Sequence, residues 1–280
     1  MEQQPASAGG SDSGPRDSCE AVVLVSRPHQ ALVPADLRLE SQPLAMPGEG
    51  EVQVAVRFVS LEPFTRLFLD EVVLGRHIPG IPIGGVLPGA GVGEVVASRA
   101  DALQVGDLVE GRLGWRDGWT GPAASLRKLD PSLGAPQTAL GILGLPGLSA
   151  YTGMVTVAGI AAGETAIVSS AAGAVGLVAG QIARARGARA VGIAGGPEKC
   201  AMVVAHGFDA CIDYRAPDFE ARLAAACSGG AQVYFDNVGG KVAMAAYANL
   251  AGAAGWRCAA CYRSTRARWA RPATSGGSCA

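Results

Sequence analysis

A loop of small residues between a strand and a helix constrains this chain most. The β-branched run at residues 165–169 leads into Ser-Ala-Ala-Gly-Ala-Val-Gly at 170–176. Apolar residues then recur at helical spacing, at Val178, Ile182 and Ala185, which predicts a helix over 175–186. A strand that turns directly into a helix starts a βαβ unit, and such units place their strands parallel in one sheet.

The alternation of strands and helices continues along the second half of the chain. Further strands are expected at residues 189–194, 210–214 and 232–235, and further helices at 197–206 and 218–227. Strands separated by helices of about ten residues predict an α/β fold with a Rossmann-like, doubly wound parallel sheet.

The first half follows a different pattern, in which short Val-rich runs alternate with Gly and Pro turns. Strands are expected at residues 21–26, 51–61, 91–98 and 107–111. Such short runs bounded by turns predict a small antiparallel barrel or sandwich over residues 20–130.

Composition excludes several classes of protein. Hydrophobic residues make up 49% of the 280 residues and charged residues 17%, so the chain can bury a sizeable core. The net charge of −1 gives no general attraction to nucleic acid or to anionic membranes, so we expect neither partner. The seven cysteines form no regular framework, and the start lacks a signal peptide, which predicts a cytoplasmic protein with reduced thiols.

One weakly charged stretch could be mistaken for membrane spans. Between Pro131 and Ala183 the only charged residue is Glu164. Pro146 and several glycines interrupt the stretch, so no apolar segment of about 20 residues remains. We expect a buried helix followed by a central strand that is covered on both faces.

The loop after the first parallel strand has the spacing of a dinucleotide-binding fingerprint. Ala171 takes the first glycine position, Gly173 the second and Gly176 the third. Gly173 would let a pyrophosphate approach the backbone, and Gly176 would let the helix pack closely on the strand. Two glycines alone are weak evidence in a chain with 40 of them. The context of strand, loop and helix favours nucleotide binding over simple helix packing.

The residues at the ends of the following strands indicate which nucleotide is favoured. An NAD site places Asp or Glu at the end of the second strand, but this chain has Gly195 and Gly196 there, with Lys199 one turn later. This arrangement suits a 2′-phosphate and predicts NADPH; the alternative for Lys199 is a solvated helix lysine. Tyr214 and Asn237 end the third and fourth strands, where ligands bind in such sheets. Their alternative roles are an ordinary strand-end tyrosine and an Asx turn.

Several motifs stand in a fixed order along the chain. They include SLEPFTR at 60–66, GLPGLSAY at 144–151, AGAVG at 172–176, DY at 213–214 and YFDNVGG at 234–240. Together they resemble the zinc-free branch of the medium-chain dehydrogenase/reductase superfamily. This branch includes prostaglandin reductases, leukotriene B4 12-hydroxydehydrogenases, alkenal double-bond reductases and curcumin-reductase-like enzymes. The resemblance covers residues 20–242 and implies a GroES-like β-barrel domain in front of the Rossmann-like domain.

The resemblance also implies an activity and a set of cofactor contacts. The implied reaction is NADPH-dependent reduction of the C=C bond of small α,β-unsaturated aldehydes or ketones by hydride transfer. The implied cofactor contacts are Gly173, Ala174, Val175, Gly176, Leu177, Gly195, Lys199, Tyr214 and Asn237. No catalytic residue is assigned, since the family's usual tyrosine has no good match, Tyr262 included. A cofactor-binding remnant without turnover, a quinone-reductase-type activity and a homodimeric assembly are left open.

After about Val242 the chain departs from the family pattern. From Asn237 onward it has no Asp or Glu, whereas Lys241 and five arginines are basic. A shifted reading frame would produce such a change, which sequencing of the locus and transcript would test; the alternative is a genuine basic tail for an acidic partner.

We therefore expect a disordered tail at 1–19, a GroES-like substrate domain at 20–140, an incomplete Rossmann-type NADP-binding domain at 141–255 and an atypical basic tail at 256–280.

Metal chemistry is not expected. Cys258 and Cys261 have the spacing of a zinc pair, but a structural zinc needs two further ligands and the whole chain has three histidines. Residues 20–130 contain His29 and His77 and no cysteine, which is too few for a catalytic zinc held by Cys and His.

The first prediction concerns the choice of cofactor. A charge-assisted contact between Lys199 and a 2′-phosphate should contribute roughly 1.5–3 kcal/mol, or about ten- to a hundredfold in affinity. Lys199→Glu should therefore weaken NADPH far more than NADH when each is titrated into the purified protein. Equal losses for the two cofactors would show that Lys199 does not read the 2′ position.

Overall fold

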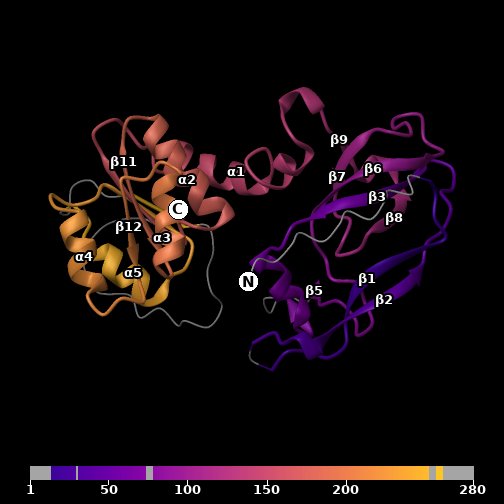
Figure 1. The fold of residues 1–280 in the computed structure, drawn as a ribbon, viewed down its shortest axis with the longest axis horizontal. Helices are drawn as coiled ribbons and strands as arrows, with labels where there is room; N and C mark the ends of the chain where they lie inside the picture. The colour runs from indigo at the N-terminus through magenta and orange to yellow at the C-terminus, as the bar shows by residue number, and fades with distance from the viewer. Residues whose placement is uncertain (1–13, 30, 74–77, 252–256, 261–280) are drawn as a thin grey trace, which may run out of the picture. The chain divides into compact units, whose positions relative to one another are not determined.

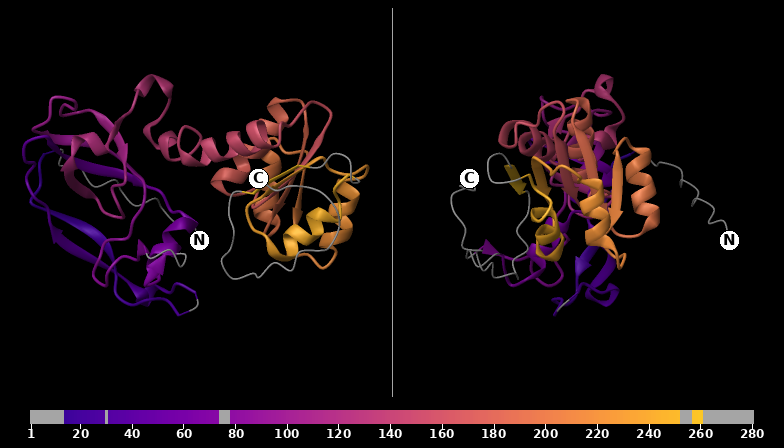
Figure 2. Two further views of the ribbon diagram at one scale, coloured as in Figure 1. Left: turned by 180° about the vertical axis from the view of Figure 1, so that it is seen from behind. Right: turned by 90° about the vertical axis from the view of Figure 1, so that its left-hand side faces the viewer.

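The computed structural model of the protein describes residues 14–29, 31–73, 78–251 and 257–260. The chain divides into two units, Met1–Leu140 and Gly141–Ala280. Figures 1 and 2 show strands and turns in the first unit and helices around one sheet in the second.

The main sheet of the first unit is antiparallel and has the strand order β8-β3-β6-β7-β9. Its strands are β3 (Glu51–Val59), β6 (Gly91–Ser98), β7 (Leu108–Gly111), β8 (Gly118–Pro122) and β9 (Arg127–Lys128). Two strand pairs accompany it: β1 (Ser18–Leu24) with β2 (Leu37–Pro43), and β4 (Val72–Val73) with β5 (Ile78–Pro79). Short 3₁₀ turns lie at Pro34–Asp36, Pro63–Leu69, Ala123–Ser125, Pro131–Leu133 and Pro136–Leu140.

The four strands expected in this unit form, as β1, β3, β6 and β7. Side chains of β3, β6 and β7, among them Val52, Val54, Val95 and Val109, pack into one apolar core, whereas Leu24 of β1 packs in a second, smaller one. Strands β2 and β8 were not expected. The sequence of β8 contains two glycines and Pro122, and it fits the sheet because β8 lies at an edge, where proline breaks no inner hydrogen bond.

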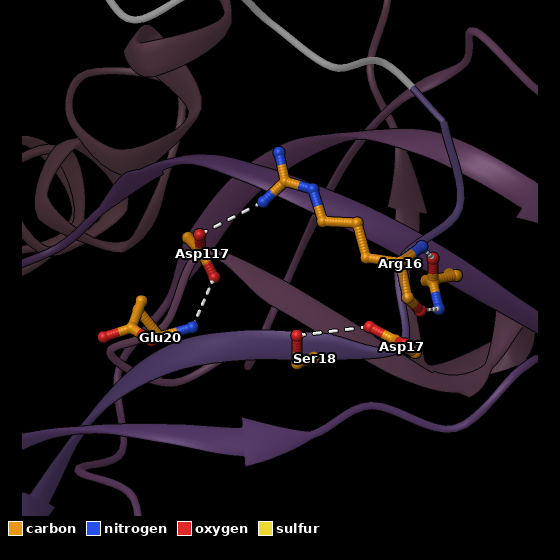
Figure 3. A network of polar contacts seen from close by, with 6 residues as sticks. Arg16, Asp17, Ser18, Glu20 and Asp117 are labelled. Atoms are coloured by element: carbon orange, nitrogen blue, oxygen red, sulfur yellow. Dashed lines mark hydrogen bonds and ion pairs between the residues drawn. The ribbon is translucent and has the colours of Figure 1, made fainter.

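The start of the described chain is tied to this unit by polar contacts (Figure 3). The buried amide of Gln53 accepts from the backbone N–H of Arg16 at 2.7 Å and donates to its carbonyl at 2.9 Å. The carboxylate of Asp117 pairs with the Arg16 guanidinium at 3.1 Å and accepts from the Glu20 N–H at 2.8 Å. Strand β1 begins at Ser18. Residues 16–19 therefore belong to the first unit rather than to the expected tail, because the buried Gln53 amide binds the Arg16 backbone and β1 includes Ser18 and Cys19.

The second unit contains one parallel sheet with the order β12-β11-β10-β13-β14. Its strands are β10 (Thr165–Ser169), β11 (Arg189–Ala194), β12 (Ala210–Asp213), β13 (Val233–Asp236) and β14 (Arg257–Ala260). The helices are α1 (Leu145–Tyr151), continued by a π-helical segment Thr152–Val157, α2 (Ala174–Ala185), α3 (Pro197–Ala205), α4 (Phe219–Ala226) and α5 (Gly240–Tyr247). This topology confirms the Rossmann-like α/β fold.

Two apolar cores cover the faces of this sheet. On one face, side chains of α1, α2 and α3 pack with Ala166, Val168 and Phe235 of the strands. On the other face, α4 and α5 pack with Ile167 and Tyr234. The alternation of neighbouring residues between the cores is the pleat of a strand that is buried on both sides. The covered central strand expected after Glu164 is thus β10.

The described residues after Val242 are part of the Rossmann-like fold. Helix α5 extends to Tyr247, and β14 pairs in parallel with β13, with Arg257 opposite Val233. Four residues expected in the basic tail therefore form a sheet strand, which backbone hydrogen bonds allow whatever the charge of the side chains. The rest of that tail, residues 261–280, lies outside the described part, as do residues 1–13 of the expected N-terminal tail.

The helix expected to be buried before β10 is buried on one side only. Ala150 and Met154 lie in the core, but Leu145, Leu148 and Tyr151 are 65%, 62% and 56% exposed. The expected buried helix is therefore buried on one side only, because its apolar residues are spread around the helix rather than along one stripe. Within the described ranges, no helix combines the length and apolar character needed to cross a bilayer.

The second prediction tests the close packing of α2. A Cβ on Gly180 would lie 1.9 Å from Cζ of the buried Phe208. Gly180→Ala should lower the free energy of unfolding by about 1–3 kcal/mol, although alanine is the better helix former. Chemical denaturation measures the loss.

Phe208→Leu provides the control, because a smaller side chain leaves room for the new methyl group. The double variant Gly180→Ala/Phe208→Leu should be more stable than the sum of the two single losses predicts. Strict additivity would contradict a steric clash at this contact.

Candidate functional site

The expected cofactor residues all follow the carboxyl ends of neighbouring parallel strands. The loop at 170–177 follows β10, Gly195 and Lys199 follow β11, Tyr214 follows β12, and Asn237 follows β13. The strand order reverses at β10, which pairs with β11 on one side and with β13 on the other. In open α/β sheets, ligands bind at such a reversal, outside the carboxyl ends of the strands.

The loop between β10 and α2 presents backbone donors to this edge. Ser170 adopts a φ of 49°, which is uncommon for a residue with a side chain, and its carbonyl accepts from Gly173 N at 2.9 Å. Helix α2 then begins at Ala174. The N–H groups of Ala174, Val175 and Gly176 open the helix and have no carbonyl one turn earlier to bind. Together with the helix dipole, N–H groups in this position are suited to bind an anion.

Leu177 differs from the other expected loop contacts. Its N–H donates to the Gly173 carbonyl at 2.9 Å, as the first regular hydrogen bond of the helix. The structure therefore uses this N–H within α2, so it is not free to donate to a ligand.

The glycines of the loop have separate steric reasons. A Cβ on Gly176 would lie 2.3 Å from the Ser170 carbonyl oxygen, so only glycine lets α2 approach the end of β10. A Cβ on Gly173 would lie 3.2 Å from that oxygen, a tight but adjustable contact. Alanine is tolerated at position 171 because it faces Gly192, where an added Cβ would lie 2.9 Å from the Ala171 methyl group.

A cleft of about 330 Å³ lies beside the end of β11, and its lining includes Gly195, Gly196, Pro197, Glu198, Lys199 and Arg215. Arg215 was missed by sequence reasoning, although its place directly after Tyr214 could have indicated it. Lys199 lines the cleft from the first turn of α3 and Arg215 from the loop after β12, so the cleft can hold an anion.

Asp213 holds these two loops together. One oxygen of its carboxylate accepts from Gly196 N and from Arg215 N, each at 2.9 Å. These backbone hydrogen bonds hold the pKa of Asp213 below its usual value. The carboxylate is thus turned toward backbone donors, as a brace between the ends of β11 and β12.

Tyr214 lies against the tip of β11. A Cβ on Gly195 would lie 2.9 Å from the ring atom Cε1 of Tyr214, so this glycine makes room for the ring. Two cations flank the ring: Arg215 Cζ is 5.7 Å and Lys241 Nζ is 5.9 Å from its centroid. Lys241, taken from the sequence only as part of a basic segment, thus belongs to the surroundings of Tyr214.

Asn237 is fixed across the reversal of strand order. Its backbone N–H donates to Ser169 Oγ at 2.8 Å, and its side-chain Nδ2 donates to the Ser169 carbonyl at 2.8 Å. With Nδ2 engaged, the amide oxygen is the part of the side chain that can meet a donor on a ligand.

The buried carboxylate of Asp236 supports this arrangement and was not expected from the sequence. Its Oδ1 accepts from Tyr234 Oη at 2.8 Å, Gly239 N at 2.9 Å, Val238 N at 3.0 Å and Ser169 Oγ at 3.2 Å. Burial raises the pKa of Tyr234, so its hydroxyl keeps the proton that it donates. Asp236 therefore shapes the turn that carries Asn237.

Among the residues that the structure describes, no three His, Cys, Asp or Glu side chains gather in a way that could hold a metal ion. Cys19, Cys200, Cys211 and Cys227 are free thiols, while Cys261 of the Cys-x-x-Cys pair lies outside the described part. The absence of a zinc requirement stays a prediction.

The residues that follow the carboxyl ends of β10, β11, β12 and β13 together form what we call the crevice. Among those that the structure describes, we assign none as a general acid.

Two family models match the chain. The N-terminal domain of oxidoreductase matches residues 20–129, and the zinc-binding dehydrogenase domain matches residues 174–257. The second match continues past Val242, so the expected end of the resemblance at that residue is wrong.

Two reductases are similar in sequence to most of this chain. NADPH-dependent curcumin reductase of Escherichia coli (strain K12) is 42% identical over 221 residues, which cover 79% of this chain and 64% of that protein. Prostaglandin reductase 1 of Rattus norvegicus is 36% identical, over 74% of this chain and 62% of that protein. The chain thus spans less than two thirds of the length of these two relatives.

A solved structure is similar over most of the chain. The crystal structure of CurA from Vibrio vulnificus in complex with NADPH superposes with a TM-score of 0.77 and 35% identity. The match covers 82% of this chain and 68% of CurA.

The third prediction separates the two glycines of the loop. Gly176→Ala should lower both the melting temperature and the affinity for a dinucleotide, because the methyl group pushes α2 away from β10. Gly173→Ala should leave the melting temperature nearly unchanged and weaken binding, because its methyl group fits the fold but occupies the approach to the phosphates. Thermal unfolding and fluorescence titration measure the two effects. Equal melting temperatures for the two variants would contradict the contacts described for Gly176.

Proposed function

This chain belongs to the medium-chain dehydrogenase/reductase superfamily, beside the curcumin and prostaglandin reductases, and on that basis we propose that it is an NADPH-dependent oxidoreductase. The reaction we propose is reduction of the C=C bond of a small α,β-unsaturated aldehyde or ketone. The observation that carries the proposal is the crevice itself, where a phosphate-binding helix start and a cationic cleft follow neighbouring strands of the sheet.

The residues of the crevice fit the parts of NADPH in order. The free N–H groups that open α2 suit the pyrophosphate. The cleft with Lys199 suits the 2′-phosphate. The end of β11 has no carboxylate that could accept a hydrogen bond from the ribose 2′-hydroxyl of NAD. Asn237, held by Ser169, offers its amide oxygen to the nicotinamide half. When bound, NADPH supplies the hydride, and these residues bind and orient it.

The substrate class in this proposal rests on the family resemblance. Two of the similar proteins are named as reductases of curcumin and of prostaglandins, and the motifs at 60–66 and 144–151 resemble the same branch. A cytoplasmic location belongs to the same proposal, and a homodimer is one assembly that it allows.

A second candidate is cofactor binding with little or no turnover. Its support is that the described crevice provides no residue that we assign as a proton donor. Binding of NADPH needs only the loop and the cleft, whereas hydride transfer needs the two reacting carbons held about 3–3.5 Å apart. A quinone in place of the enone is a third, chemically related option.

The fourth prediction distinguishes these candidates. Purified chain 1–280 should quench or shift NADPH fluorescence on binding, and NADPH oxidation should rise on addition of an unsaturated aldehyde or ketone, followed at 340 nm. A saturated ketone of the same carbon skeleton is the control and should give no oxidation.

Each alternative has its own outcome in this assay. Binding without oxidation for any unsaturated carbonyl would favour the non-catalytic candidate. Oxidation of NADPH with quinones alone would change the proposed substrate class from enones to quinones. Absence of NADPH binding would overturn the proposed function.

A further inference from the structure

The cleft beside β11 contains a cation that the sequence motifs did not indicate. Arg215 lines the cleft together with Lys199, but it comes from the loop after β12 rather than from α3. A lysine on a helix and an arginine on a separate loop can contact one anion from two directions, which a single lysine cannot do.

The position of Arg215 is defined by its neighbours. A Cβ on Gly195 would lie 3.2 Å from Arg215 Nε, so the guanidinium side chain passes directly over the tip of β11. Its Cζ lies 5.7 Å from the centroid of the Tyr214 ring, at the distance of a cation–π contact. The ring therefore limits the freedom of a side chain that is otherwise exposed.

The backbone of Arg215 is fixed as well. Asp213 binds Arg215 N and Gly196 N through the same carboxylate oxygen, which ties the loop of the arginine to the loop of the glycine tip. The charge of Asp213 is engaged by these donors. Glu198 is the carboxylate among the lining residues of the cleft, and its side chain is exposed to solvent.

We propose that Arg215 is the second cation of the 2′-phosphate site and that it shares the discrimination of NADPH from NADH with Lys199. The inference rests on the proposed function, since it assigns a residue within the same cofactor site. A guanidinium can donate two parallel hydrogen bonds to a phosphate, whereas an ammonium acts as a point charge. Arg215 thus adds geometric selectivity for a phosphate at the ribose 2′ position.

The experiment titrates the full chain with NADPH, NADH and the fragment 2′,5′-ADP. Arg215→Gln should weaken NADPH and 2′,5′-ADP by about tenfold or more, and NADH by less than about twofold. Arg215→Lys should retain part of the affinity for NADPH. Arg222→Gln on α4 is the matched control, because it removes an exposed arginine near Asp213 that does not line the cleft, and it should leave all three affinities unchanged.

The outcomes separate this inference from the proposed function. Unchanged NADH affinity in Arg215→Gln shows that the variant is folded. Equal losses for NADPH and NADH would assign Arg215 to the adenine or to the fold and overturn the inference, as would no loss at all. A wild-type chain that binds neither cofactor would overturn the proposed function and the inference together.

Discussion

The contact between the start of helix α2 and the end of strand β10 is the constraint on which the rest of the second unit depends. Because a Cβ at Gly176 would come within 2.3 Å of the Ser170 carbonyl oxygen, the helix can begin here only through a glycine. That approach sets the helix start above the reversal of strand order, and the opening N–H groups then face the crevice. The unusual φ of Ser170 belongs to the same turn, in which backbone strain and ligand geometry coincide.

Two aspartates divide the support of the crevice between them. Asp236 connects the end of β13 with β10 through Ser169, and Asp213 connects the end of β12 with the tip after β11. Both carboxylates bind backbone N–H groups of the turn that follows their own strand. Because backbone donors satisfy them, both carboxylates fix the loops that carry Asn237 and Arg215.

Much of this architecture could be predicted from local patterns, and the failures share a cause. Strands β10 and β11 were predicted to the residue, since periodicity and flanking glycines are properties of short segments. Arg215 was missed because its significance comes from Gly195 and Lys199, which lie 20 and 16 residues away in the sequence. Residues 16–19 were expected in the tail because Gln53 and Asp117, the partners that hold Arg16, are far along the chain. Strand β14 was missed because its pairing with β13 is made by backbone hydrogen bonds, which leave no residue pattern in the sequence.

The pairing of Ala171 with Gly192 has a consequence for how such a sequence can change. The two positions are 21 residues apart and lie on adjacent segments, and methyl groups on both would be only 2.9 Å apart. Alanine at 171 is therefore neutral only in a background that already has glycine at 192, and glycine at 192 cannot be exchanged while alanine stays at 171. The packing thus affects the order in which substitutions can occur at the two positions. The residue at each position limits which mutations are accessible at the other, so the two sites are epistatic.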